Sequence, residues 1–576
     1  MKDIPLYEVE KINDLRDMLQ QSVQQFGDKP AFLVKDPKAA RVSQNQENND
    51  YLPVSYKRYG RDVDAFGTKL KSLGLDDTRV AIMSETRYEW YVTYLSTVNG
   101  VGVTVPLDKE LPENEIISLL NRSKSQVLVY SSSKQSVVDN LHGKVDTLQY
   151  LVCMDHPETE SAESFWDWLE QGEKALQEGD RSFQDAVIDP ETMSVLLFTS
   201  GTTARSKAVM LSHKNICINL MAMCSMLYIG PDDVFLSVLP LHHTYECTCG
   251  FLCPVYRGCT IAVCEGLRHI TKNMQESKVT IMLVVPLMLE LFYKRIMKSA
   301  TADPKLAKKF HFGLGLSRFL RKLGIDKRRE IFDKVHTTFG GHLRVLVAGG
   351  ASIDPRIMTG MQDLGLHCVQ GYGLTECAPI LALNRDIDYD NRAAGLPLPG
   401  VDIKIIEKDE NGIGEIIGKG PNVMIGYYED EEATNEAIDE DGYFHTGDLG
   451  YINEAGFVII TGRKKNVIIT KNGKNIFPEE IEFLLNRSEY IQECLVSGIQ
   501  TDDGDIEVAA EIFPNMEAVQ EKLGDVQVES EAVRDLMAQE VKKVNQGLTT
   551  YKYIRIFTLR STEFDKTTSK KIKRKY

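Results

Sequence analysis

The sequence has 576 residues, of which 43% are hydrophobic and 26% are charged, close to the averages for folded soluble proteins. This length exceeds what one hydrophobic core supports and predicts roughly three or four structural units. The net charge of −16 argues against general nucleic-acid binding. Residues 1–11 lack the apolar core of a secretory signal, and the most apolar stretch, 281–292, is shorter than the roughly 20 residues that cross a bilayer. We therefore expect a protein of the cytoplasm.

Residues 1–190 alternate amphipathic helical patterns with short apolar runs. Residues 59–73 have a helical period, and residues 79–83 are typical of a strand. The segment 35–49 is polar and rich in turn residues, which predicts an exposed loop. This alternation predicts an α/β domain with parallel sheets.

A polar loop follows the apolar run at 194–198. Residues 199–207 contain five hydroxyl side chains, one glycine and two cations. Hydroxyls donate hydrogen bonds and Lys207 adds a positive charge, so the loop suits a polyphosphate, with a plain surface turn as the alternative. A Walker A loop is excluded, because Ser206 precedes the lysine where glycine is required and Ala208 follows it where Ser or Thr would bind magnesium. Ser212 is a predicted helix N-cap, so we expect the loop to join a strand to a helix.

Eleven cysteines are scattered along the chain, which is typical of reduced thiols. The densest group combines three of them with two histidines: His242, His243, Cys247, Cys249 and Cys253. This spacing differs from that of structural zinc sites, so a zinc site is the weaker alternative.

The polar loop resembles the phosphate loop of the adenylate-forming superfamily, T-S-G-T-T-G-x-P-K-G-V, with departures at Ala204, Ser206 and Ala208. This superfamily includes acyl-CoA synthetases, adenylation domains of peptide synthetases and firefly luciferase. Further segments match its motifs in the same order: 240–246, 284–289, 370–376, 395–400, 414–416, 446–448, 462–465, 471–482 and 566–574. The glycines at 349–350 follow a predicted buried strand and would allow close backbone approach to a planar ligand. The resemblance implies an α/β fold with a large N-terminal domain of parallel-rich sheets and helices, a small β-barrel-like subdomain, and a small mobile C-terminal α/β domain.

The resemblance also implies ATP, Mg²⁺ and CoA as ligands and a role for each matching residue. His243 would lie beside the substrate carboxylate, and Thr375 and Lys571 would act in catalysis. Magnesium would be bound by Thr202 and Glu376, and the thiol would enter past Gly473. The residues implied in ATP or AMP binding are Thr199, Ser200, Gly201, Thr202, Thr203, Lys207, Gly350, Ala351, Gln370, Gly371, Tyr372, Gly373, Thr375, Asp448, Arg463 and Lys571.

The same resemblance implies the domain organisation. An N-terminal domain, 1–462, would bind ATP and the acid. A hinge at 463–465 would pivot at Lys465, and a mobile C-terminal domain, 466–576, would carry the catalytic Lys571. The neighbouring Lys570 stands where the family has glycine.

We therefore predict a ligase that converts a carboxylic acid and ATP to acyl-adenylate and pyrophosphate, and then to acyl-CoA and AMP. The insert 298–329, with lysine and arginine among leucine and phenylalanine, resembles that of long-chain fatty acid–CoA ligases. It is either a solvated helical face or a weak peripheral contact with an anionic membrane. Leu241 stands where amino-acid-activating relatives have aspartate, which disfavours an amino acid substrate. An acyl carrier protein as acceptor, an aryl or medium-chain acid, and a non-catalytic ATP-binding protein are the alternatives.

Overall fold

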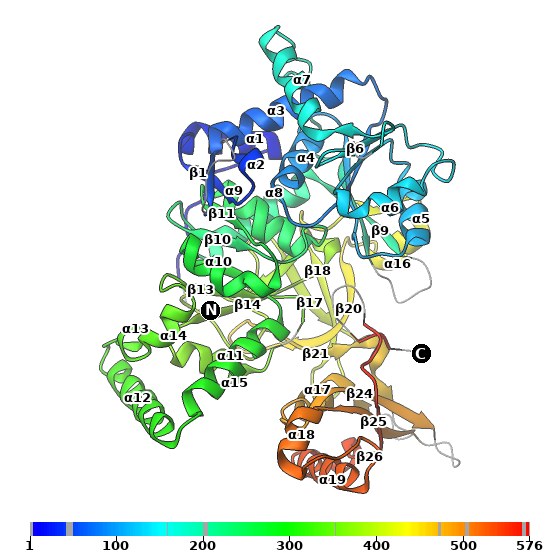
Figure 1. Cartoon of the computed structure of the whole chain (residues 1–576). Helices are drawn as coiled ribbons and strands as arrows, with labels where there is room; N and C mark the ends of the chain where they lie inside the picture. The colour runs from blue at the N-terminus through cyan, green and yellow to red at the C-terminus, as the bar shows by residue number, and fades with distance from the viewer. Residues whose placement is uncertain are drawn as a thin grey trace. The chain divides into compact units, whose positions relative to one another are not determined.

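The computed structural model describes residues 4–41, 50–157, 159–199, 206–351, 353–469, 474–500, 506–566 and 572–574. The chain forms two compact units (Figure 1). Unit 1 comprises residues 1–403, 418–444 and 455–457, and unit 2 comprises residues 404–417, 445–454 and 458–576. The large N-terminal part with mostly parallel sheets and the smaller C-terminal part confirm the predicted fold class. The predicted domain limits and the hinge at 463–465 stay predictions.

Two large sheets form the framework of unit 1. Among the described residues, the first sheet has nine strands in the order β16-β15-β14-β13-β12-β10-β11-β1-β2. The strands from β14 to β1 in this order run parallel, and β15, β16 and β2 are antiparallel additions at its ends. Their bounds are β1 (Pro30–Val34), β2 (Leu52–Ser55), β10 (Val234–Ser237), β11 (Thr260–Val263), β12 (Ile281–Val284), β13 (Val345–Ala348), β14 (His367–Gly373), β15 (Ile380–Leu383) and β16 (Leu396–Pro397).

In the part of the chain that is described, the second sheet of unit 1 has eight strands in the order β19-β9-β8-β4-β3-β5-β6-β7. The strands from β8 to β7 in this order run parallel, and β9 and β19 are antiparallel additions. Their bounds are β3 (Arg79–Met83), β4 (Val103–Pro106), β5 (Val127–Tyr130), β6 (Tyr150–Cys153), β7 (Glu163–Ser164), β8 (Met193–Thr199), β9 (Lys207–Ser212) and β19 (Gly426–Tyr427).

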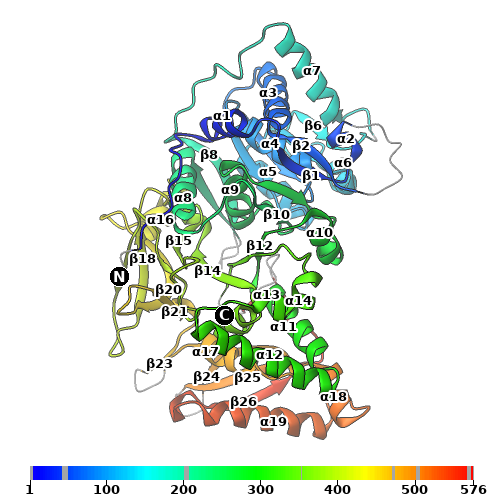
Figure 2. The same ribbon diagram turned by 90° about the vertical axis from the view of Figure 1, so that its left-hand side faces the viewer.

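Helices of unit 1 cover both sheets (Figure 2). Helix α4 is buried at every position and carries four aromatic residues in its first seven positions, as expected of a helix enclosed by protein on all sides. The bounds of the helices are α1 (Leu15–Phe26), α2 (Pro37–Ala40), α3 (Tyr56–Ser72), α4 (Tyr88–Val98), α5 (Glu113–Ser123), α6 (Gln135–Asp139), α7 (Phe165–Gln177), α8 (His213–Met226), α9 (Cys253–Tyr256), α10 (Ile270–Ser277), α11 (Pro286–Thr301), α12 (Pro304–Lys322), α13 (Arg328–Ile331), α14 (Asp333–Thr338), α15 (Pro355–Asp363) and α16 (Glu431–Ala437). No helix among the described residues is long and apolar enough to cross a membrane.

Several local predictions are confirmed. The predicted strands at 79–83 and 194–198 are β3 and β8, and the predicted helix at 59–73 is α3. Ser212 caps α8, since its Oγ accepts a hydrogen bond from the Asn215 backbone N–H at 3.1 Å, and Asn215 Oδ1 accepts one from the Ser212 N–H at 2.9 Å. This reciprocal pair satisfies two backbone donors that the first helical turn leaves free.

Two local predictions are wrong. The polar loop joins two strands, because Lys207–Ser212 forms β9 before the helix begins. Ala208, Val209 and Leu211 are buried there, so pairing with β8 places their side chains in the core. The segment 35–49, predicted as a loop, contains the short helix α2, whose Ala39 is buried, and the structure describes only residues 35–41 of the segment.

Unit 2 contains three smaller sheets. A sheet of four strands in the order β17-β18-β20-β21 precedes a two-stranded and a three-stranded sheet, counted over the described residues. The strands are β17 (Asp402–Ile406), β18 (Gly414–Lys419), β20 (Phe444–Ile452), β21 (Val458–Arg463), β22 (Ile468–Ile469), β23 (Asn475–Ile476), β24 (Ile491–Gln500), β25 (Ile506–Pro514) and β26 (Ile554–Leu559). The helices are α17 (Pro478–Leu485), α18 (Met516–Leu523) and α19 (Glu531–Gln546). They share an apolar core with the three-stranded sheet.

Candidate functional site

The carboxyl edge of the nine-stranded sheet brings several predicted site residues together. Strands β10, β12, β13 and β14 are adjacent and parallel, so the segments that follow them meet at one edge. Ala348 of β13 pairs with Gln370 of β14, which places Gly350 and Ala351 near the end of β14. Ligands of parallel α/β sheets bind at such an edge.

Two motifs that are far apart in the sequence meet at this edge. Thr375 begins a short helical turn after β14, and its Oγ1 lies 3.3 Å from Oγ1 of Thr244 in the segment that follows β10. Gly373, which precedes Thr375, has no room for a side chain, since a Cβ would lie 1.9 Å from the Pro379 carbonyl oxygen. Tyr372 is buried next to it. Thr244 lies within the motif segment 240–246, but its contact with Thr375 was not predicted from the sequence.

His243, predicted to lie beside the carboxylate, is part of a small group of polar side chains. Its ring centroid lies 4.1 Å from that of His242. His242 Nε2 in turn lies 3.6 Å from Asp108 Oδ2, just after β4. Burial and the adjacent His243 lower the pKa of His242 to about 3, so His242 is neutral at physiological pH. The sequence offered no signal that Asp108 joins this group.

A buried carboxyl group lies one turn further on. Glu246 is in the π-helical segment Tyr245–Leu252, and Ser237 donates a hydrogen bond to its Oε1 at 2.6 Å. Burial raises the pKa of Glu246 to about 8, so the group is largely protonated at neutral pH. Gly250 leaves space for this side chain, since a Cβ there would lie 2.7 Å from the Glu246 carboxyl carbon. Glu246 is the last residue of the motif segment 240–246, although no role was predicted for it.

The end of the polar loop meets the glutamate predicted to bind magnesium. The Lys207 ammonium lies 4.4 Å from the centre of the Tyr427 ring, and the Tyr427 hydroxyl donates a hydrogen bond to Glu376 Oε1 at 2.9 Å. Strand β19 places Tyr427 there by pairing with Val209 of β9. Burial and the neighbouring Glu376 raise the pKa of Tyr427, so its hydroxyl stays a donor. Tyr427 connects two predicted residues and was missed by sequence reasoning.

The residues present fit magnesium better than a metal held wholly by protein. Among the described residues, no group of three or more His, Cys, Asp and Glu side chains is arranged to hold a metal ion. Mg²⁺ commonly takes one or two carboxylates together with substrate phosphates, which suits Glu376. The histidines and cysteines of 242–253 are not among any such group in the described residues.

The two residues predicted to bind the ribose pair with each other in unit 2. Asp448 of β20 and Arg463 of β21 are register partners, and Arg463 Nε lies 2.8 Å from Asp448 Oδ1. Arg463 Nη1 also donates to the Thr446 carbonyl at 3.1 Å. The Asp448 side chain is buried and Arg463 is exposed. Their ion pair therefore orients the carboxylate before any ligand binds. Lys465 lies in a short helical turn just after this pair.

Several predicted residues lie outside the described residues. They are Ser200, Gly201, Thr202 and Thr203 of the polar loop, Gly473, and both Lys570 and Lys571. Thr199 is described and pairs with Lys207 across the β8–β9 hairpin.

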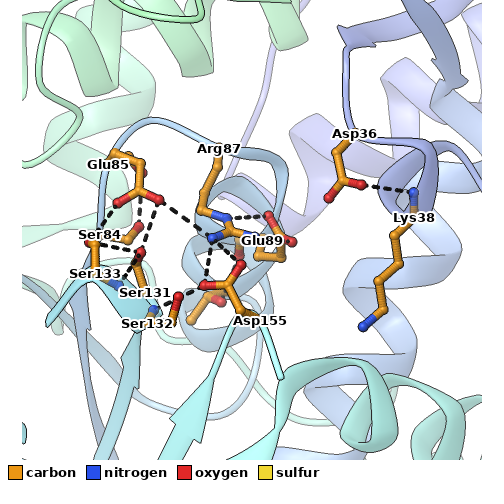
Figure 3. Close-up of polar contacts among 11 residues, drawn as sticks. Asp36, Lys38, Ser84, Glu85, Arg87, Glu89, Ser131, Ser132, Ser133 and Asp155 are labelled. Atoms are coloured by element: carbon orange, nitrogen blue, oxygen red, sulfur yellow. Dashed lines mark hydrogen bonds and ion pairs between the residues drawn. The ribbon is translucent and has the colours of Figure 1, made fainter. Parts of the chain in front are cut away.

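A second polar cluster, missed by sequence reasoning, lies at the carboxyl ends of β3, β5 and β6 in the eight-stranded sheet (Figure 3). Arg87 pairs with Glu89 at 2.8 Å and with Asp155 at 2.9 Å. Glu85 accepts a hydrogen bond from Ser131 Oγ at 2.9 Å. The charged groups are paired with one another, so we assign this cluster to stabilising the loops that follow the strands.

Comparison with known proteins gives consistent matches. The family described as AMP-binding enzyme matches residues 19–428. Long-chain-fatty-acid–CoA ligase 1 of Cavia porcellus is 28% identical over 536 residues, covering 86% of this chain and 73% of the relative. Long-chain-fatty-acid–CoA ligase 5 of Mus musculus is 30% identical over 493 residues, covering 78% of this chain and 70% of the relative.

Solved structures show the same fold. ATP-bound MatB from Rhodopseudomonas palustris is similar with a TM-score of 0.72 at 24% identity, and the match covers 97% of each chain. The matched family spans both large sheets of unit 1, including the Lys207, Tyr427 and Glu376 group. The chain therefore belongs to the AMP-binding enzyme family.

Proposed function

We propose that this enzyme activates a long-chain fatty acid with ATP, forming acyl-adenylate and pyrophosphate, and then transfers the acyl group to CoA with release of AMP. The observation that carries the proposal is the grouping of Lys207, Tyr427 and Glu376 in a member of this family. A cation and a carboxylate that share one aromatic residue suit a polyphosphate and its magnesium ion.

Each proposed role follows from what the side chain can do. A carboxylate lacks a good leaving group, so it attacks the α-phosphorus of ATP, and the bond to the pyrophosphate oxygen breaks. Lys207 stabilises the charge that leaves with pyrophosphate. Magnesium, when bound at Glu376, neutralises phosphate charge. Asp448 accepts hydrogen bonds from the ribose hydroxyls, because a carboxylate can accept from both.

The remaining roles rest on the family resemblance. By this resemblance, Lys571 would reduce the repulsion between the attacking carboxylate and the α-phosphate. No side chain forms a covalent intermediate. A thiol then attacks the acyl-adenylate after a movement about Lys465 replaces Lys571 with the segment around Gly473.

The long-chain substrate is supported by the relatives named above and by Leu241, which disfavours an amino acid. None of the eleven cysteines, all of them among the described residues, is in a disulfide, which fits the proposed location in the reducing cytoplasm. The acyl chain supplies binding energy through its length. Burying one methylene contributes about 0.8 kcal/mol, so eight further carbons could contribute roughly 6 kcal/mol before ordering costs.

The test is ATP–pyrophosphate exchange over a panel of acids, followed by product analysis with CoA. We expect kcat/KM to rise from octanoate to palmitate and the product to be palmitoyl-CoA. A maximum of kcat/KM at acetate or benzoate contradicts the long-chain assignment. If exchange occurs but a thioester forms only when an acyl carrier protein is added, CoA is not the acceptor. If none of the acids supports ATP–pyrophosphate exchange, that result contradicts catalysis by this protein.

A further inference from the structure

Helix α12 and its C-cap residue Leu323 present four large apolar side chains on one exposed face. Phe312, Leu316, Phe319 and Leu323 follow one another at intervals of four, three and four residues, which aligns them on a helix. Their exposed fractions are 73%, 39%, 60% and 60%. We call these four residues the apolar stripe. A contiguous exposed group of this kind marks an interaction surface more often than a scattered leucine does.

The opposite face of α12 packs firmly on unit 1, which fixes the direction of the stripe. The Phe310 ring lies 5.7 Å from Phe332, and Leu314 packs against the core beneath the nine-stranded sheet. Ser317 is buried, and Arg318 pairs with Asp363 at 2.6 Å. The stripe is therefore presented outward by packing on its other side.

The charge around the stripe is opposite to that of the whole protein. The chain has a net charge of −16, yet α12 contains four lysines, two arginines and no Asp or Glu: Lys305, Lys308, Lys309, Lys322, Arg318 and Arg321. Both arginines pair with Asp363. Within the described residues, no carboxylate lies within ion-pair distance of the four lysines.

Three of these lysines continue the stripe toward the start of the helix. At 3.6 residues per turn, Lys305, Lys308 and Lys309 lie within about 60° of Phe312 around the helix axis. All three are exposed. The face is thus apolar at one end and cationic at the other, and its lysines are free to reach an external anion.

We propose that this face of α12 is a docking surface for an anionic phospholipid bilayer. The phenylalanine and leucine side chains enter the interfacial region, and the lysines neutralise lipid head groups around them. Carboxylates of an acidic protein partner are bound best by arginine, whose guanidinium group donates two parallel hydrogen bonds. Both arginines of α12 already pair with Asp363, which disfavours such a partner. A second copy using the same face would bring like charges together. The proposal does not depend on the activity proposed above.

The test is flotation of the full chain with vesicles of phosphatidylcholine alone or with 30% phosphatidylglycerol. We expect binding to the anionic vesicles only, and weaker binding as salt is raised. Lys305→Gln/Lys308→Gln/Lys309→Gln should lower the partition coefficient about a hundredfold, since each lysine near such a surface contributes about a factor of five. Phe312→Ser/Phe319→Ser should lower it by at least about tenfold.

The matched control removes three exposed lysines elsewhere on unit 1. Lys57→Gln/Lys71→Gln/Lys174→Gln, on α3 and α7 away from α12 (Figures 1 and 2), makes the same change in net charge and should bind as the parent does. The thermal unfolding temperature should be unchanged in all variants, because the altered side chains are exposed. A Phe319→Trp reporter should shift to shorter wavelength on anionic vesicles and be quenched by brominated lipid.

Three results would overturn the proposal. They are the absence of binding to anionic vesicles, equal binding by the parent and the Phe312→Ser/Phe319→Ser variant, and a parent dimer in sedimentation equilibrium that this variant abolishes. The last result would assign the face to contact between two copies of the chain.

Discussion

Replacing Tyr427 with phenylalanine removes one hydroxyl group and keeps the ring. The ring lies 4.4 Å from the Lys207 ammonium, so that contact should persist in the variant. The hydroxyl donates to Glu376 Oε1 at 2.9 Å, and this hydrogen bond is lost. The substitution therefore separates the orientation of Glu376 from the placement of Lys207.

The size of the effect follows from the charge of the acceptor. Removing a hydrogen bond to a charged group typically costs about 1.5–3 kcal/mol. If Glu376 must hold one orientation in the transition state, that range corresponds to a fall of about 10- to 150-fold in kcat/KM. The pKa of Tyr427 is raised by burial, so the hydroxyl stays protonated and the effect should not vary between pH 7 and 9.

The assay is ATP–pyrophosphate exchange with palmitate at a series of Mg²⁺ concentrations. We expect Tyr427→Phe to need more Mg²⁺ for half-maximal rate, a change that a purely structural role would not produce. Tyr428→Phe is the control, because its ring lies over Arg79 and Lys124. It should stay within about twofold of the parent. An unchanged rate and unchanged Mg²⁺ dependence in Tyr427→Phe would refute this reasoning.

Three further predictions concern other parts of the chain. Asp448→Ala removes the carboxylate that pairs with Arg463 and should weaken ATP binding by about 1–3 kcal/mol, measured by calorimetry, and unchanged affinity would count against the ribose assignment. Lys571→Ala should lower pyrophosphate exchange by several orders of magnitude, while thioester formation from supplied acyl-adenylate survives. Lys570→Gly should leave both half-reactions within a few-fold of the parent. Loss of exchange on replacing Lys570 but not Lys571 would mean that the alignment is wrong by one residue. Burial lowers the pKa of His213 to about 4, below its ordinary 6.5, so the unfolded chain takes up the proton first and stability falls as the pH drops from 6.5 toward 4. At pH 5.5 the free energy of unfolding should be lower by about 1 kcal/mol for this reason. His213→Gln should lose less unfolding free energy than the parent between pH 7.5 and 5.5, measured by urea unfolding followed by tryptophan fluorescence. An equal loss in the variant and the parent would contradict the assignment.

The strands and helices that follow simple periodicity were predictable from sequence. Residues 79–83 are an uninterrupted apolar run apart from Arg79 and form a parallel strand buried at every position. Ser212 was predictable as a cap because a hydroxyl before a helix accepts from the first turn. Both features depend on local interactions, which a sequence displays directly.

The wrong prediction at β9 depends in part on a distant partner. Strand β9 pairs with β8 across the polar loop and also with β19, where Met210 meets Gly426, more than 200 residues along the chain. No local pattern shows that this pairing exists. The alternation of Ala208, Val209, Met210 and Leu211 therefore gave too little signal to separate a strand from the start of α8.

Motif residues were easier to identify than their neighbours. Lys207 and Glu376 were predicted from the motifs, and the structure brings them together through Tyr427. Thr244 lies within the motif segment 240–246 and meets Thr375 only through folding. Asp108 follows β4 of the other large sheet and approaches His242 in the same way. Residues outside a motif carry no signal of such a role in a single sequence.

The central claim is that the acid attacks the α-phosphorus of ATP. The most direct measurement is the fate of oxygen during turnover with doubly ¹⁸O-labelled palmitate, ATP and CoA, with the nucleotide products analysed by mass spectrometry. The mechanism predicts one ¹⁸O atom in AMP, none in pyrophosphate, and one retained in palmitoyl-CoA. Formation of ADP, with the label in inorganic phosphate, would contradict it.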